Sequence, residues 1–138
     1  MAISRGKLFL GVLIALIVCF GLGFAWGNSG RGELQTTVDD IKQHLDVAEA
    51  RGEILDGRVS LYNSNFGDAS RHFESAKAPL QRVRERYQAQ SKRDAVTSID
   101  TAAGLVDEAQ KMAAKLDPAA NNKAGQALEA IKAAESSR

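Results

Sequence analysis

Two aspartate–histidine pairs come closest, by residue type and spacing, to a site that could do chemistry. Asp40 and His44 stand four residues apart, as do Asp68 and His72, which puts both side chains of a pair on one helix face. Imidazole and carboxylate groups are ligands that zinc accepts, but a closed zinc site needs about four of them. Because the sequence brings only two together, it predicts no metal site and no cofactor.

Motifs for catalysis are missing from the sequence as well. It contains no nucleophile elbow, no phosphate-binding glycine loop and no paired-cysteine motif. No spacing groups a serine with a histidine and an acid. We therefore expect no enzymatic activity and no small-molecule substrate. The net charge of +1 gives no reason to expect a nucleic-acid partner.

The longest apolar run lies near the amino terminus. Residues 8–26 contain no charged, amide or hydroxyl side chain. As a helix they would reach roughly 28 Å, about the hydrocarbon thickness of a bilayer, and Trp26 stands where an interfacial aromatic would anchor the end. The sequence predicts a single transmembrane helix over residues 8–27. A secretory signal cleaved after Gly27 is the alternative.

The charges beside this run predict its orientation. Arg5 and Lys7 precede it closely, and the positive-inside rule then favours an amino terminus on the inside of the membrane. Residues 28–138 would lie outside, in the periplasm if the protein is bacterial and resides in the inner membrane. The reverse topology is the alternative.

Small residues recur at every fourth position of the apolar run. Such a stripe lets membrane helices approach closely, so it predicts a helix-packing face for a second copy or another membrane subunit. The alternative is the ordinary abundance of glycine and alanine in membrane helices. The stripe consists of Gly11, Ala15, Cys19, Gly23 and Gly27.

Beyond a turn-rich stretch at 28–32, apolar residues return in alternating steps of four and three, which is typical of a coiled coil. Turn-forming residues at 63–68 interrupt the pattern, so we expect two antiparallel helices over about 33–62 and 68–90. The pattern comprises Leu34, Val38, Ile41, Leu45, Ala48, Leu55, Val59, Tyr62, Phe66, Ala69, Phe73, Ala76, Leu80, Val83 and Tyr87, with Gly52 in the missing place.

Two further helices complete the expected domain. Ser91 and Asp94 have the spacing of a capping box, and Asp117-Pro118 suits the start of a last helix. That last helix is rich in alanine, which buries little surface, so we expect it to pack weakly. The predicted fold class is all-α: a transmembrane helix followed by a helical-hairpin or bundle domain of about four helices. The predicted parts are a tail (1–7), a membrane helix (8–27), a linker (28–32), the domain (33–116) and a weakly packed helix and tail (117–138).

The hairpin resembles a single tetratricopeptide repeat over residues 53–81. The resemblance rests on a small residue in the first helix, an aromatic at the turn, and an alanine, an aromatic and an alanine in the second helix. These are Gly57, Phe66, Ala69, Phe73 and Ala76. Asp56 and Ser60 depart from the repeat, which has leucine and tyrosine there. The resemblance implies a protein-binding hairpin without enzymatic activity. The plain alternative is that any helical hairpin needs such residues where its helices cross.

Five basic residues gather near the end of the second hairpin helix. They could contact anionic lipid headgroups or an acidic partner, and the alternative is a solvated helix face. They are Arg82, Arg84, Arg86, Lys92 and Arg93.

The sequence as a whole predicts a non-enzymatic, membrane-anchored helical interaction protein that acts as an accessory or scaffold subunit of a membrane complex. Its expected partners are the lipid bilayer and either another membrane subunit or a second copy of the chain. The alternatives are a homo-oligomeric membrane or envelope spacer, and a secreted helical domain.

Overall fold

The computed structural model describes the backbone of residues 5–137, and the side chains of residues 34–137 together with residues 11, 13, 14 and 16–19. Four helices occupy this described part: α1 (Arg5–Tyr62), α2 (Phe66–Ala89), α3 (Arg93–Ala114) and α4 (Ala120–Ser136). The predicted all-α class and helical bundle are confirmed. The chain divides into two units, Met1–Asp40 and Ile41–Arg138.

The predicted transmembrane helix over residues 8–27 requires a correction. Within the side chains that the structure describes, no helix holds an apolar stretch long enough to cross a bilayer. This finding contradicts the membrane helix, the single-pass localisation and the inside amino terminus. The predicted boundary is also missing, since α1 does not end at residue 27 and residues 28–32 are helical. Glycine costs a helix about 1 kcal/mol relative to alanine and serine or asparagine less, so such residues weaken a helix without ending it.

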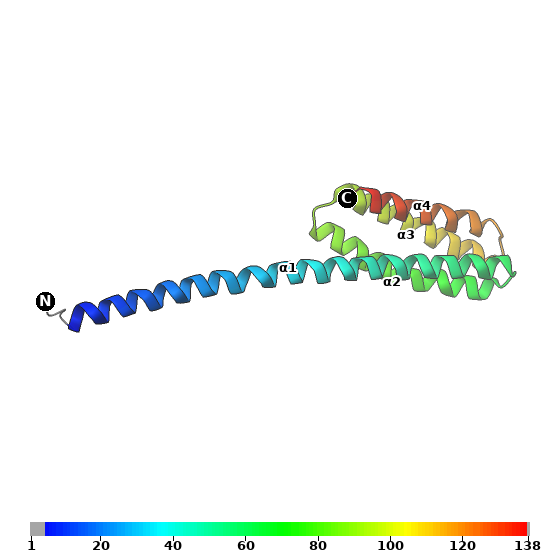
Figure 1. Cartoon of the computed structure of the whole chain (residues 1–138). Helices are drawn as coiled ribbons and strands as arrows, with labels where there is room; N and C mark the ends of the chain where they lie inside the picture. The colour runs from blue at the N-terminus through cyan, green and yellow to red at the C-terminus, as the bar shows by residue number, and fades with distance from the viewer. Residues whose placement is uncertain (1–4, 138) are drawn as a thin grey trace. The chain divides into compact units, whose positions relative to one another are not determined.

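The second unit is a four-helix bundle, hereafter the bundle (residues 41–138), in which each helix runs antiparallel to its neighbours (Figure 1). α2 packs on α3, and α3 packs on α4. Polar contacts join α1 to α2 through Asp46 and Arg82, and α1 to α4 through Arg51 and Glu135. The four helices therefore close into a ring around one core.

The core is built from one seam on each helix, spaced in alternating steps of four and three, as in a coiled coil. On α1 we call these positions the buried seam: Gln43, Val47, Ala50, Ile54, Gly57 and Leu61. The other helices contribute Ala69, Phe73, Ala76, Leu80, Val83 and Tyr87 from α2, Ala95, Ile99, Ala102, Val106, Ala109 and Ala113 from α3, and Ala120, Ala124, Ala127, Ile131 and Ala134 from α4.

Large and small residues alternate across this core. A Cβ atom added to Gly57 would lie 2.6 Å from Cε1 of Phe73, so the glycine is what lets α1 and α2 approach at that level. The same antiparallel register puts Ala50 opposite Leu80, and Ile54 opposite Ala76. The alanines of α4 are fully buried in the same core, since small side chains let the helices come close.

The connections between helices are short, and each contains one residue in the left-handed conformation: Ser64, Ser91 and Leu116. Such a residue commonly ends a helix. Ser91 therefore serves the end of α2, and the predicted capping box with Asp94 does not form, since the residue that caps α3 is Lys92 without a side-chain hydrogen bond.

Candidate interaction surface

α1 carries a second apolar row on the side away from the core, which we call the exposed stripe: Ile41, Leu45, Ala48, Gly52, Leu55, Val59 and Tyr62. Leu45 is 63% exposed, Val59 59% and Tyr62 87%. At 3.6 residues per turn, the exposed stripe and the buried seam are centred roughly 160° apart around the helix. Leu34 and Val38, which belong to the first unit, are also exposed.

This row belongs to the pattern of four-and-three steps from which the sequence predicted the hairpin helices, and on α1 these positions lie outside the core. The α2 part of the predicted pattern, from Ala69 to Tyr87, is buried as expected. The reason for the difference is size. Phe73 needs the space above Gly57, whereas Leu55 and Val59 of the exposed stripe would fill that space with side chains of their own.

A hollow of about 420 Å³ opens on the exposed stripe near its carboxyl end. Its lining includes Leu55, Arg58, Val59 and Tyr62, with Asn63 and Asn121 at the edge. The first four residues are spaced as the four residues of one helix that receive a side chain from a facing helix in a coiled coil. The hollow therefore has the arrangement of a coiled-coil hole that would receive a side chain from a second helix.

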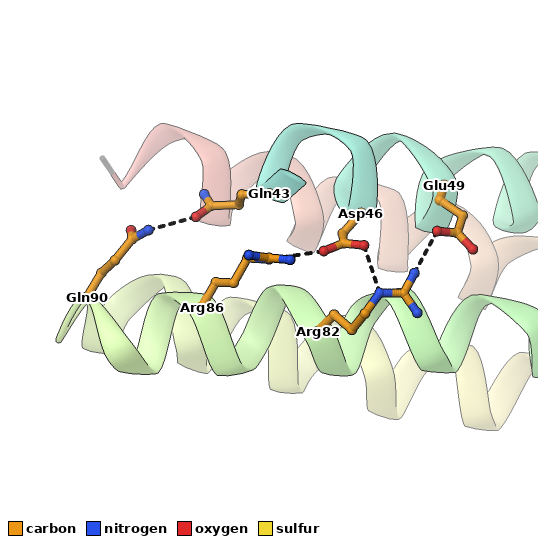
Figure 2. Close-up of polar contacts among 6 residues, drawn as sticks. All are labelled: Gln43, Asp46, Glu49, Arg82, Arg86 and Gln90. Atoms are coloured by element: carbon orange, nitrogen blue, oxygen red, sulfur yellow. Dashed lines mark hydrogen bonds and ion pairs between the residues drawn. The ribbon is translucent and has the colours of Figure 1, made fainter. Parts of the chain in front are cut away.

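Acidic residues border one side of the exposed stripe, where α1 meets α2. Figure 2 shows how they bind arginines of α2. The Nε atom of Arg82 donates to Asp46 at 2.7 Å, its second guanidinium nitrogen donates to Glu49 at 2.6 Å, and Arg86 donates to the other Asp46 oxygen at 3.0 Å. The hydrogen bond with Asp46 is the main cause that raises the pKa of Arg82.

Basic residues border the other side, where α1 meets α4. Arg51 binds Glu135 at 2.8 Å, and the Nε atom of Arg58 donates to Asn121 at 2.8 Å. The side chain of Arg51 remains 39% exposed, so it can also reach beyond the bundle. The exposed stripe thus runs between an acidic edge and a basic edge.

The predicted basic cluster is distributed over several of these contacts. Arg82 and Arg86 bind α1, and Arg84 donates to Asp100 of α3 at 2.5 Å. Lys92 lies 6.0 Å from the centroid of the Tyr87 ring, and Arg93 is exposed. Three of the five cations therefore join helices within the bundle. Their partners are 16 to 40 residues away in sequence, so no local sequence pattern indicates these contacts.

The residues that carried the tetratricopeptide resemblance lie together where α1 crosses α2. Gly57 faces the ring of Phe73, Ala69 and Ala76 are fully buried, and Phe66 packs on the core from the turn. Their role here is to pack the hairpin.

The histidine pairs are not brought together as ligand pairs. His72 Nδ1 lies 2.8 Å from Glu53 Oε2 on α1, while Asp68 is hydrogen-bonded to Asn65 and Arg71. Within the described residues, no cluster of three histidine, cysteine or carboxylate side chains is placed to hold a metal ion.

The predicted small-residue stripe lies in the first unit. Gly11 and Cys19 are exposed, and a Cβ atom at Gly11 would meet open space. Ala15, Gly23 and Gly27 fall outside the side chains that the structure describes.

Comparison of the chain with protein-family models, with curated proteins and with solved structures finds no match.

The sequence did not lead us to expect an exposed apolar row on α1. A second apolar face could have indicated it, because α1 has apolar residues in steps of four and three on two faces, and one helix of a closed bundle needs only one such face.

Proposed function

We propose that the protein is a helical interaction module, in which the bundle holds α1 rigid and the exposed stripe binds a helix of a protein partner. The observation that carries the proposal is the exposure of five large apolar side chains, Ile41, Leu45, Leu55, Val59 and Tyr62, in one straight row. Scattered surface leucines are ordinary, but a contiguous apolar row between charged edges is typical of a protein-binding surface.

The arrangement suits an interaction role rather than catalysis. The hollow on the exposed stripe is lined by leucine, valine and tyrosine together with Arg58 and two asparagines, and no carboxylate, histidine, serine or cysteine is among its lining residues. An amphipathic helix binds such a row through apolar anchors at helical spacing, with rim charges that select the partner. A non-enzymatic accessory or scaffold role follows from this reading.

Site-specific photocrosslinking tests the proposal in the cells that produce the protein. A benzophenone amino acid is placed at Leu45 or Leu55, and as a control at Leu116, a leucine of similar exposure outside α1. We expect one adduct of defined mass from both stripe positions and none from Leu116. Equal labelling from Leu116, or no adduct from the stripe, would overturn the proposal.

A further inference from the structure

We infer that the partner of the exposed stripe is a second copy of the same chain, with the two α1 helices packed side by side in parallel. This inference rests on the proposed function and adds the identity and direction of the partner. Three features of the bundle carry it: the heptad spacing, the sign of the charges on the two edges, and the hollow at the carboxyl end.

The heptad spacing assigns a role to each position of the exposed stripe. In the letters abcdefg, Leu45, Gly52 and Val59 are a positions, and Ile41, Ala48, Leu55 and Tyr62 are d positions. These are the positions that meet across a two-stranded coiled coil. The buried seam falls on the c and f positions, so a second helix could dock on a and d without displacing α2 or α4.

The flanking positions decide the direction. The g positions along the basic edge are His44, Arg51 and Arg58, and the e positions along the other edge include Glu49 and Asp56. In a parallel pair, each g position faces the e position five residues later on the other helix. Arg51 then faces Asp56 of the second copy, and His44 faces Glu49.

An antiparallel pair would bring like edges together. In that arrangement g positions face g positions and e positions face e positions, so arginine edges would meet each other and carboxylate edges would do the same. Like charges placed against each other across an interface disfavour that arrangement. Lys42 is the one e position that departs from the acidic pattern, and its parallel counterpart is the uncharged Thr37.

The hollow fits the parallel register. In that register the a-position side chain of Val59 from the second copy enters the space between Leu55, Arg58, Val59 and Tyr62. By the two-fold symmetry of the pair, each copy supplies one knob and one hole. Near the middle of the row, Ala48 and Gly52 are small, and a Cβ atom at Gly52 would meet nothing within 4 Å, so the two helices can approach closely there.

Disulfide trapping of the full chain tests both the partner and the direction. In a Cys19→Ser background, we introduce cysteine at Leu45, at Val59, and at Thr97 as an exposed control on α3. In a parallel pair each a position meets its own copy, so Leu45→Cys alone and Val59→Cys alone each give a covalent dimer under mild oxidation, and Thr97→Cys does not.

The other outcomes would overturn the inference in distinguishable ways. A covalent dimer that forms only when the Leu45→Cys chain is mixed with a Leu55→Cys chain would show an antiparallel pair, because a positions then meet d positions of the other copy. Covalent dimers in equal yield from Thr97→Cys would show random collision. If no stripe cysteine forms a dimer while photocrosslinking at Leu55 yields an adduct with a different protein, the self-association is rejected and the proposed function stands.

A variant with charges introduced into the exposed stripe measures the strength of the pair without touching the core. Leu45→Glu together with Leu55→Glu should raise the dissociation constant of the dimer by about 10,000-fold, because burying one leucine is worth about tenfold in an equilibrium constant and the symmetric pair loses four of them. Leu116→Glu should leave it unchanged. An unchanged constant in the double variant would contradict the assigned interface.

Discussion

The two apolar faces of α1 have the same residue spacing, but one is buried in the core and the other is exposed. Each face contains one glycine and one alanine, but the buried seam adds Gln43 and three large apolar residues, whereas the exposed stripe adds five large apolar residues. If total hydrophobicity decided burial, the exposed stripe would be inside. The comparison teaches that a closed bundle selects the face whose side-chain sizes complement its neighbours, and that the more apolar face can remain exposed.

The largest expected effect contrasts neighbouring residues on the two faces. Ile54 is fully buried and Leu55 is 47% exposed. Ile54→Ala should lower the free energy of unfolding by about 2 to 5 kcal/mol, because it leaves a cavity in the core. Leu55→Ala should change it by less than about 0.5 kcal/mol in protein dilute enough to be monomeric. Urea denaturation followed by circular dichroism measures both free-energy changes. Equal losses of unfolding free energy in the two variants would contradict the assignment of one face as buried and the other as exposed.

A smaller effect with opposite signs is expected at two glycines. Gly57→Ala should destabilise the bundle by about 1 to 3 kcal/mol, since the new methyl group collides with the Phe73 ring. Gly52→Ala should stabilise it by up to about 1 kcal/mol, since the space is open and alanine is the better helix former. Both are measured as thermal unfolding in the Leu45→Glu/Leu55→Glu background, where pairing does not contribute. Destabilisation by both substitutions would contradict the register of α1 on α2.

A weaker effect is expected for the charges at the edge of the exposed stripe. Asp56→Lys places a cation where Arg51 of a parallel second copy would lie, and it should weaken association by about 0.5 to 1 kcal/mol, as for a rim ion pair. Asp56→Glu is the matched control and should associate as the unmodified chain does. The difference should shrink as salt is raised, because exposed charges are screened. Tighter association of Asp56→Lys would point to an antiparallel pair.

The smallest expected effect is a pH dependence that belongs to the bundle alone. The hydrogen bond from Lys77 is the main cause that lowers the pKa of Glu74, and the one from Lys111 is the main cause that lowers the pKa of Asp107. Carboxylates with lowered pKa stabilise the folded state above their unfolded values near 4.5 and 3.8, and this stability is lost as the pH falls through the folded values.

Lys77 contributes to the stability of the folded state at the basic end of the pH range. Its hydrogen bond with Glu74 is the main cause that raises its pKa above 10.5, so its contribution is complete below that pH and is lost as the pH rises through the folded value. Glu74→Gln with Asp107→Asn should therefore flatten the acid limb of a melting-temperature profile slightly, because these groups are only half-buried or exposed to solvent. An acid limb identical to that of the unmodified chain would contradict the assignment.

The sequence predicted the helical content, the hairpin and the α2 seam, because a spacing of four and three marks a helix face wherever it occurs. It could not predict which face of α1 is buried, because two faces satisfy the same rule and the choice depends on the fit of Gly57 against Phe73. The membrane helix over 8–27 was predicted from an apolar run read in isolation, and the structure contradicts it. The partners of the basic cluster within the bundle could not be predicted for a similar reason, since Asp46 and Asp100 reach its arginines only after the chain has folded.

Sedimentation equilibrium of the full chain tests the central claim most directly, namely that the exposed stripe of α1 is the interface for a second copy. The Cys19→Ser chain should sediment with twice the 14.8 kDa chain mass, the same chain with Leu45→Glu and Leu55→Glu should sediment with the single mass, and the Leu116→Glu control should match the parent. A single mass for the parent chain, or a doubled mass that survives both leucine substitutions, would contradict the account.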